Sequence, residues 1–159
     1  MDTLSWDEYF ISVAFLSSMR SVDPNNRGGA CLVNSENRIV GIGYCGLPRG
    51  IDELHDGDDG RYFVCHSIMN AILNKNQHDI KGSRVYTSRF PCSECAKLII
   101  QAGVNRVIYS AGEIVEASKI LFTLAGVSVF QFSPKTRKCV LLCATKNASS
   151  SNIPPIVQS

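Results

Sequence analysis

The sequence lacks three features that would assign it to a common class of protein. It has no excess of charge of one sign, because 16 Lys and Arg residues oppose 14 Asp and Glu residues, whereas nucleic-acid-binding domains carry a marked basic surface. Its apolar runs are far too short to span a bilayer. Its first residues contain no basic segment followed by an apolar one, so we expect no signal peptide. These absences argue against polymeric nucleic acid and membranes as partners.

The cysteine content indicates a reducing compartment. Seven cysteines are an odd number in a chain without a secretory signal, which favours free or metal-bound thiols over a disulfide framework. We expect the cytoplasm, with the nucleus as the alternative. The length of 159 residues suits one domain with a sizeable core. We place that domain at residues 1–143 and expect the Ser- and Pro-containing tail, 144–159, to be disordered.

The apolar periodicity predicts an α/β domain. Ser5 and Glu8 form a capping-box pattern ahead of apolar residues at helical spacing, which predicts a helix over 6–20. These apolar residues are Phe10, Val13, Ala14, Leu16 and Met19. A hairpin pattern follows, and strands then alternate with helices, which favours parallel pairing through right-handed crossovers. The sequence therefore predicts a three-layer α/β/α domain with a mixed five-stranded sheet. The expected strands are 29–33, 38–44, 84–87, 106–109 and 127–130, and the expected further helices are 66–75, 92–102 and 113–125.

Two segments between the hairpin and the second helix have a distinctive composition. The residues Gly43, Gly46 and Gly50, together with Pro48, predict a loop in which the backbone runs close to another group, although an ordinary glycine-rich turn explains them equally well. Residues 51–62 are acidic and poor in apolar groups, which predicts a solvated loop or lid.

One histidine and one Cys pair have the composition of a metal site. His66 and the sequence Pro-Cys-x-x-Cys, with Cys92 and Cys95, supply three ligands, which is the number in catalytic zinc sites that keep a fourth position open. Cysteines three residues apart share one face of a helix's first turn, where the helix dipole favours thiolates. A core histidine with two buried thiols is the structural alternative.

The sequence lacks the acid/base group that usually accompanies these ligands. The zinc deaminase signature pairs H-x-E with P-C-x-x-C, and its Glu moves protons. Ile68 stands at the Glu position here. An isoleucine cannot transfer a proton, so the sequence predicts a metal site from which the catalyst has been removed.

The chain closely resembles the deoxycytidylate (dCMP) deaminases of the cytidine deaminase superfamily over roughly residues 5–132. The shared segments include 5–10, 13–17, 23–25, 33–37, 39–44, 70–72 and 95–103. The resemblance implies a zinc protein of α/β/α architecture that converts dCMP to dUMP and ammonia. It also implies an oligomer, in many members a hexamer, that dCTP activates and dTTP inhibits.

The resemblance also assigns roles to individual residues. It implies that His66, Cys92 and Cys95 hold zinc. It implies that Asn25, Cys45, Ser67 and Asn70 occupy substrate-binding positions, with Ser67 where the family has Ala. It assigns an allosteric nucleotide loop to Gly43, Tyr44, Gly46 and Gly50.

Three departures from the family fall in the expected pocket. They are Ile68 in place of Glu, Cys45 in place of the Asn of a Gly-Tyr-Asn-Gly loop, and a shortened loop before His66. We interpret Cys45 as a small buried residue, and the alternative is a fourth metal ligand.

These departures leave three hypotheses. The first is a zinc-binding dCMP deaminase homologue without a catalytic residue, inactive or severely impaired, that acts as a nucleotide binder or as a subunit of an active paralogue's oligomer. The second is an active dCMP deaminase in which Glu53 or Asp59 replaces the missing carboxylate. The third is a metal-stabilised structural subunit that binds no nucleotide.

Overall fold

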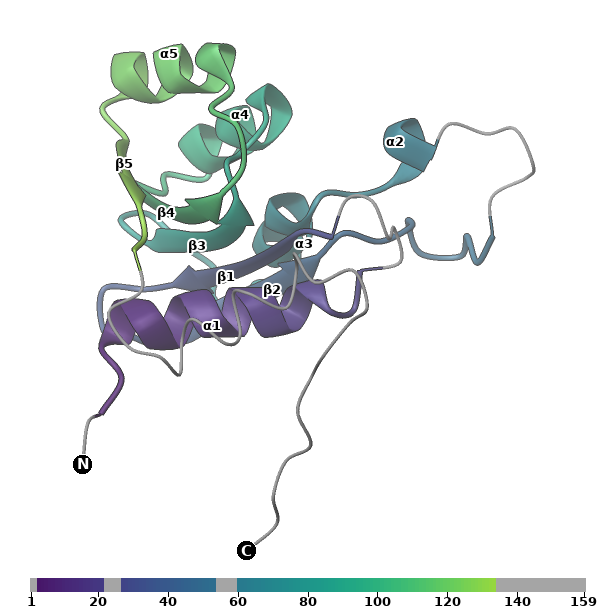
Figure 1. Ribbon diagram of the computed structural model, residues 1–159, viewed down its shortest axis with the longest axis horizontal. Coiled ribbons are helices and arrows are strands. Elements are labelled where there is room, and N and C mark those ends of the chain that lie inside the picture. The colour runs from purple at the N-terminus through teal and green to yellow at the C-terminus, as the bar shows by residue number, and fades with distance from the viewer. Residues whose placement is uncertain (1–2, 22–26, 54–59, 134–159) are drawn as a thin grey trace, which may run out of the picture.

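The computed structural model describes residues 3–21, 27–53 and 60–133. Five strands form one sheet in the order β2-β1-β3-β4-β5 (Figure 1). β1 pairs antiparallel with β2 and β3, whereas β3, β4 and β5 pair in parallel. The predicted mixed five-stranded sheet is therefore confirmed. The strands are β1 (Gly29–Val33), β2 (Ile39–Tyr44), β3 (Arg84–Arg89), β4 (Arg106–Ala111) and β5 (Ser128–Gln131).

Helices cover both faces of the sheet and complete the predicted three layers. Figure 1 shows α1 along one side and α3, α4 and α5 on the other. Two core clusters match these layers, one beneath α1 and one between the sheet and the other helices. A short helix, α2, lies at the end of the segment expected to be a loop. The helices are α1 (Trp6–Ser18), α2 (Gly60–Phe63), α3 (Ser67–Leu73), α4 (Ser93–Gln101) and α5 (Glu116–Ala125).

The capping box at the start of α1 forms as predicted. The Ser5 hydroxyl accepts a hydrogen bond from the Glu8 N–H at 3.3 Å, and the Glu8 carboxylate accepts one from the Ser5 N–H at 3.0 Å. The helix ends at Ser18 rather than at residue 20. Two residues of its predicted apolar pattern point to solvent, because Leu16 is 60% and Met19 is 50% exposed.

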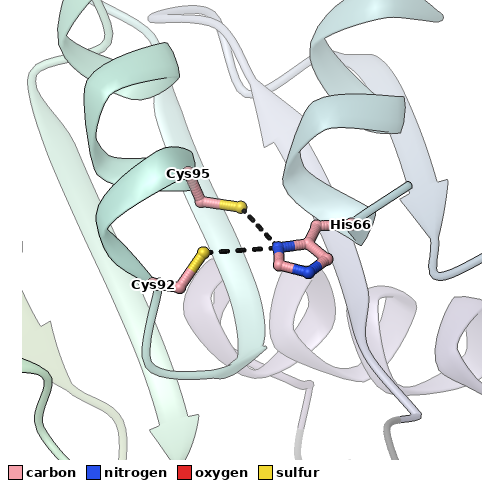
Figure 2. A group of neighbouring side chains, drawn as sticks. All are labelled: His66, Cys92 and Cys95. Atoms are coloured by element: carbon pink, nitrogen blue, oxygen red, sulfur yellow. Dashed lines mark hydrogen bonds between the residues drawn. The ribbon is translucent and has the colours of Figure 1, made fainter. Parts of the chain in front are cut away.

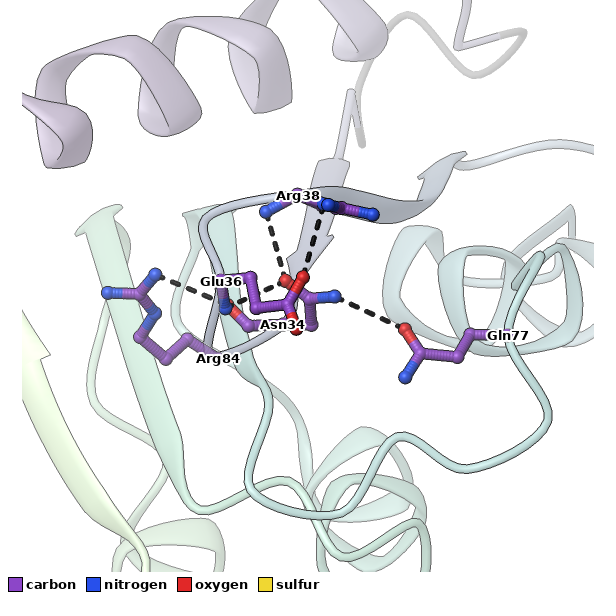
Figure 3. A network of polar contacts seen from close by, with 5 residues as sticks. All are labelled: Asn34, Glu36, Arg38, Gln77 and Arg84. Carbon is purple, nitrogen blue, oxygen red and sulfur yellow. Dashed lines mark hydrogen bonds and ion pairs between the residues drawn. The ribbon is translucent and has the colours of Figure 1, made fainter.

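Hydrogen bonds fix the turn between β1 and β2 (Figure 3). The Asn34 carboxamide oxygen accepts from the N–H groups of Glu36 and Arg38, both at 3.0 Å. The Asn34 side-chain nitrogen donates to Gln77 at 3.3 Å, and the Arg84 guanidinium donates to the Asn34 carbonyl at 3.4 Å. This turn confirms the predicted hairpin and links it to β3.

The close packing of α3 on β2 requires glycine in the strand. A Cβ placed on Gly43 would lie 2.1 Å from the Ser67 carbonyl oxygen and 2.3 Å from the Ala71 nitrogen. Helix α3 has only seven residues, too few to be stable alone, so it depends on this packing. The packing of α3 on β2 therefore explains why position 43 is glycine.

We expect Gly43→Ala to lower the free energy of unfolding by about 1–3 kcal/mol, because the added methyl group must displace helix backbone. Urea denaturation measures the loss. Gly46→Ala is the matched control, because a Cβ there would meet only the Tyr44 ring, at 3.5 Å, and should change stability by less than about 0.5 kcal/mol. Equal stability of the two variants would contradict the packing of α3 described here.

No helix in the described part of the chain is long and apolar enough to cross a membrane. Asn25, Asp59 and the proposed tail, 144–159, lie outside the described residues. The domain boundary at residue 143 therefore stays a prediction.

Candidate metal centre and adjoining pocket

Two helix N-termini bring the three predicted metal ligands together. His66 immediately precedes α3, Cys92 immediately precedes α4, and Cys95 lies in the first turn of α4. Figure 2 shows both sulfur atoms directed at the same imidazole nitrogen. The His66 Nδ1 lies 3.3 Å from the Cys92 Sγ and 3.5 Å from the Cys95 Sγ. The alternative of a core histidine with two buried thiols fits less well, because His66 and Cys92 are only half-buried.

These separations fit a tetrahedral zinc ion. Zn–S bonds of about 2.3 Å and Zn–N bonds of about 2.05 Å, set at the tetrahedral angle, place N and S about 3.6 Å apart. The two observed N···S distances, 3.3 and 3.5 Å, are close to that value. All three ligand atoms lie within 4.8 Å of one another. The site therefore needs little rearrangement to hold the ion.

The electrostatics of the group favour one preformed thiolate. A hydrogen bond from Cys95 and a second contact with His66 lower the pKa of Cys92 to about 3. The same hydrogen bond, together with burial, raises the pKa of Cys95. The contact with Cys92 raises the pKa of His66. Because a thiolate is the ligand form of cysteine, Cys92 is ready to bind a cation, whereas Cys95 must release a proton when the metal binds.

The described residues supply three ligands and leave the fourth position open. Cys45 is buried and lines the same pocket, but its thiol is not part of the donor group. The buried position of Cys45 agrees with its interpretation as a small buried residue. Three protein ligands with one open position is the arrangement of catalytic zinc sites.

A pocket of about 470 Å³ adjoins the three ligands. Ile68 forms part of its wall and is only 3% exposed, because the residue also packs in the core between the sheet and α3. Hydrocarbon therefore occupies the place where the deaminase signature has a carboxylate.

Glu113 is a pocket residue that the sequence analysis missed. It is the one carboxylate among the described residues that line the pocket. It follows the carboxyl end of β4, and Arg89 at the end of β3 also lines the pocket. Carboxyl ends of neighbouring parallel strands meet at one edge of a sheet, and this topology is the signal that identifies the pair. Glu53, by contrast, is exposed and does not line the pocket.

The predicted substrate-binding residues do not all reach the pocket. Ser67 and Cys45 line it, and Asn70 does not. The Asn70 side chain instead donates hydrogen bonds to the carbonyls of Tyr44 at 2.8 Å and Cys65 at 3.4 Å. Asn25 lies outside the described residues.

The segment predicted as an allosteric loop is in part a β-strand. Gly43 and Tyr44 belong to β2, and Gly46 pairs with Cys65 in an isolated bridge. Gly50 has a φ of 84°, and a Cβ added to it would meet no other atom within 4 Å. None of the four predicted loop residues lines the pocket beside the metal ligands. A nucleotide site in this segment stays a prediction.

Comparison with known proteins gives the family. Residues 4–111 match the family model of the cytidine and deoxycytidylate deaminase zinc-binding region. Human deoxycytidylate deaminase is 49% identical over 154 residues, which cover 88% of this chain and 86% of that protein. A probable deoxycytidylate deaminase of Drosophila melanogaster is 40% identical over 153 residues, covering 84% and 75%.

A solved structure shares the fold. The crystal structure of dCMP deaminase from the cyanophage S-TIM5 in complex with dCMP and dUMP has a TM-score of 0.71 and 28% identity, covering 83% of this chain and all of that one. The mixed sheet and the His/Cys/Cys group thus define a zinc-binding deaminase fold. The chain belongs to the deoxycytidylate deaminase family.

Proposed function

We propose that this chain is a zinc-binding dCMP deaminase homologue that binds a deoxycytidine nucleotide and deaminates it very slowly or not at all. Ile68 carries the proposal. It lines the pocket two residues after the metal ligand His66, where the deaminase signature has Glu. Its branched hydrocarbon chain neither donates nor accepts a proton.

Without a carboxylate at position 68, the site keeps its metal ligands but loses the group that would transfer protons. When bound, zinc supplies Lewis-acid activation of a water molecule near neutral pH. Deamination of cytosine also requires proton delivery to ring N3 and to the departing amine. One positioned acid/base group contributes typically about 100- to 10,000-fold to such a reaction. A chain with Ile68 is therefore expected to lose at least that factor.

Nucleotide binding is supported by the chemistry of the pocket. Its volume of about 470 Å³ lies in the usual range for small-molecule sites. Arg89 offers a guanidinium suited to phosphate, and Phe90 offers an aromatic ring. The cyanophage relative is described in complex with dCMP and dUMP. We propose dCMP as the pocket ligand and keep dCTP and dTTP as candidate regulators.

A second candidate function is an active dCMP deaminase that uses another carboxylate. Glu113 favours it, because that residue lines the pocket. Glu113 follows β4, whereas position 68 belongs to α3, so carboxylates at these two positions would approach a ligand from different elements. Glu113→Gln would abolish turnover under this hypothesis and leave it unchanged under the first.

We further propose that the chain acts as an oligomer in the cytoplasm, either with its own copies or within the hexamer of an active paralogue. The family resemblance supports an oligomer. A regulatory or structural subunit needs the fold and the metal but no turnover, which agrees with a retained His/Cys/Cys group beside Ile68.

We expect dCMP at 100 times its dissociation constant to stabilise the zinc-loaded protein by about 2.7 kcal/mol, because a ligand that binds only the folded state shifts the unfolding equilibrium. Thermal unfolding with and without dCMP measures the effect. For the turnover test of Glu113→Gln, Glu116→Gln is the matched control, because Glu116 starts α5 outside the pocket. Absence of any nucleotide-dependent shift would favour the purely structural subunit.

A further inference from the structure

Helix α3 is bonded along the outer edge of the sheet. Among the described strands β2 lies at the edge of the sheet, so one row of its carbonyls has no strand beside it there. Three donors on α3 and just beyond its end bond three alternate carbonyls of that row. The pairs are Asn70 Nδ2 with Tyr44 (2.8 Å), Asn74 Nδ2 with Ile42 (3.4 Å) and the Asn76 N–H with Val40 (2.8 Å).

The rise per residue of a helix and of a strand explains why these donors lie opposite alternate carbonyls. Four helical residues rise about 6 Å, and two strand residues rise about 6.6–6.8 Å. Asn70 and Asn74 therefore meet carbonyls two residues apart, with the helix running opposite to the strand. The strand offers no Cβ at Gly41 or Gly43, where one would lie 2.3 and 2.1 Å from helix backbone atoms.

Asn70 differs from Asn74 because it has a second bond on the metal side. Its Nδ2 also lies 3.4 Å from the carbonyl of Cys65, the residue directly before His66. Gly46 and Cys65 also exchange two backbone hydrogen bonds, of 2.8 and 3.1 Å, so the Cys65 carbonyl accepts from both Gly46 and Asn70. The Asn70 N–H donates to the His66 carbonyl at 3.0 Å. The backbone on both sides of the His66 Cα is thus bonded to one asparagine.

We infer that Asn70 is a positioning residue for the metal centre: it ties Cys65 and Tyr44 to α3 and so holds His66 where its Nδ1 meets the two thiols. His66 has no side-chain capping bond of its own at the start of α3. Its imidazole contacts the two thiols, and the backbone that carries it sets where those contacts form. Partners outside the ligand shell typically contribute about 10- to 100-fold to metal affinity.

The test compares Asn70→Leu with Asn74→Leu in zinc titrations against a chromophoric chelator. Both variants keep the branched shape of the side chain with similar added bulk, and each removes an amide bonded to a β2 carbonyl, but only the first cuts the link to Cys65. We expect zinc affinity to fall about 10- to 100-fold in Asn70→Leu and to stay within about twofold of wild type in Asn74→Leu. The absorption spectrum of the cobalt-substituted protein should change only in Asn70→Leu.

Unchanged zinc affinity in Asn70→Leu would overturn the inference. Equal losses in both variants would also overturn it, because they would point to general docking of α3. Failure of the wild-type protein to bind zinc would instead refute the metal centre itself. If Asn70→Leu does not fold, Asn70→Ser provides the same comparison, because it removes the amide without adding bulk.

Discussion

Replacing Ile68 by Glu is expected to raise the rate of dCMP deamination at least about 100-fold. The substitution returns a carboxylate to the pocket wall beside the three metal ligands, and one positioned acid/base group is worth about 100- to 10,000-fold. The gain should appear as dUMP and ammonia released by zinc-loaded protein. Because Ile68 is 3% exposed and packs in the core, some loss of stability will accompany the gain.

Two controls separate proton transfer from shape and charge. Ile68→Gln places a side chain of nearly the same size and polarity that transfers no proton, so its rate should stay at the wild-type level. Leu73→Glu adds the same charge to α3 at a position 71% exposed and outside the pocket. If a folded, zinc-loaded Ile68→Glu protein shows no gain, one carboxylate is not enough to restore the pocket, and the proposed departures at Cys45 and in the loop before His66 become the next residues to test.

Replacing His66 by Ala is expected to lower zinc affinity by well over 100-fold. The variant removes one of three ligands, a larger change than the loss of an outer partner, which typically costs about 10- to 100-fold. Cys92→Ala should have a similar effect, because it removes the thiol whose low pKa supplies a ready thiolate. Metal content after dialysis and zinc-dependent thermal stabilisation measure both losses.

His78→Ala and Cys65→Ala are the matched controls. His78 is exposed, Cys65 lies directly before His66, and neither belongs to the donor group. Both should keep the zinc affinity of wild type. If His66→Ala binds zinc as tightly as His78→Ala does, the assignment of the metal centre is wrong.

Local patterns in the sequence were enough for the sheet and the metal ligands. Strand periodicity, the hairpin turn and the crossover rule together predicted the mixed sheet, because each depends on neighbouring residues. His66, Cys92 and Cys95 were found by spacing, and the two helix starts that join them were already visible as sequence signals. The physical reason is that each ligand lies at a helix N-terminus with its own local signature.

Features that depend on tertiary contacts were not predictable. Helical spacing placed Leu16 and Met19 on the apolar face of α1, yet both are at least half exposed, because the sheet meets the helix on a neighbouring stripe. Glu113 lines the pocket because β3 and β4 end at the same edge of the sheet, so its signal lies in the sheet topology and in no short motif. Asn70 was expected at the substrate, and its side chain instead bonds backbone brought near by folding.

Whether Ile68 has removed catalysis can be measured as the release of dUMP and ammonia from dCMP by purified, zinc-loaded wild-type protein at high enzyme concentration, with and without dCTP. We expect no turnover above a metal-chelated control, or a rate at least about 100-fold below the roughly 10 per second of an ordinary enzyme. Turnover within about tenfold of that ordinary rate would contradict this expectation. Glu113 would then be the first residue to test as the replacement for the missing glutamate.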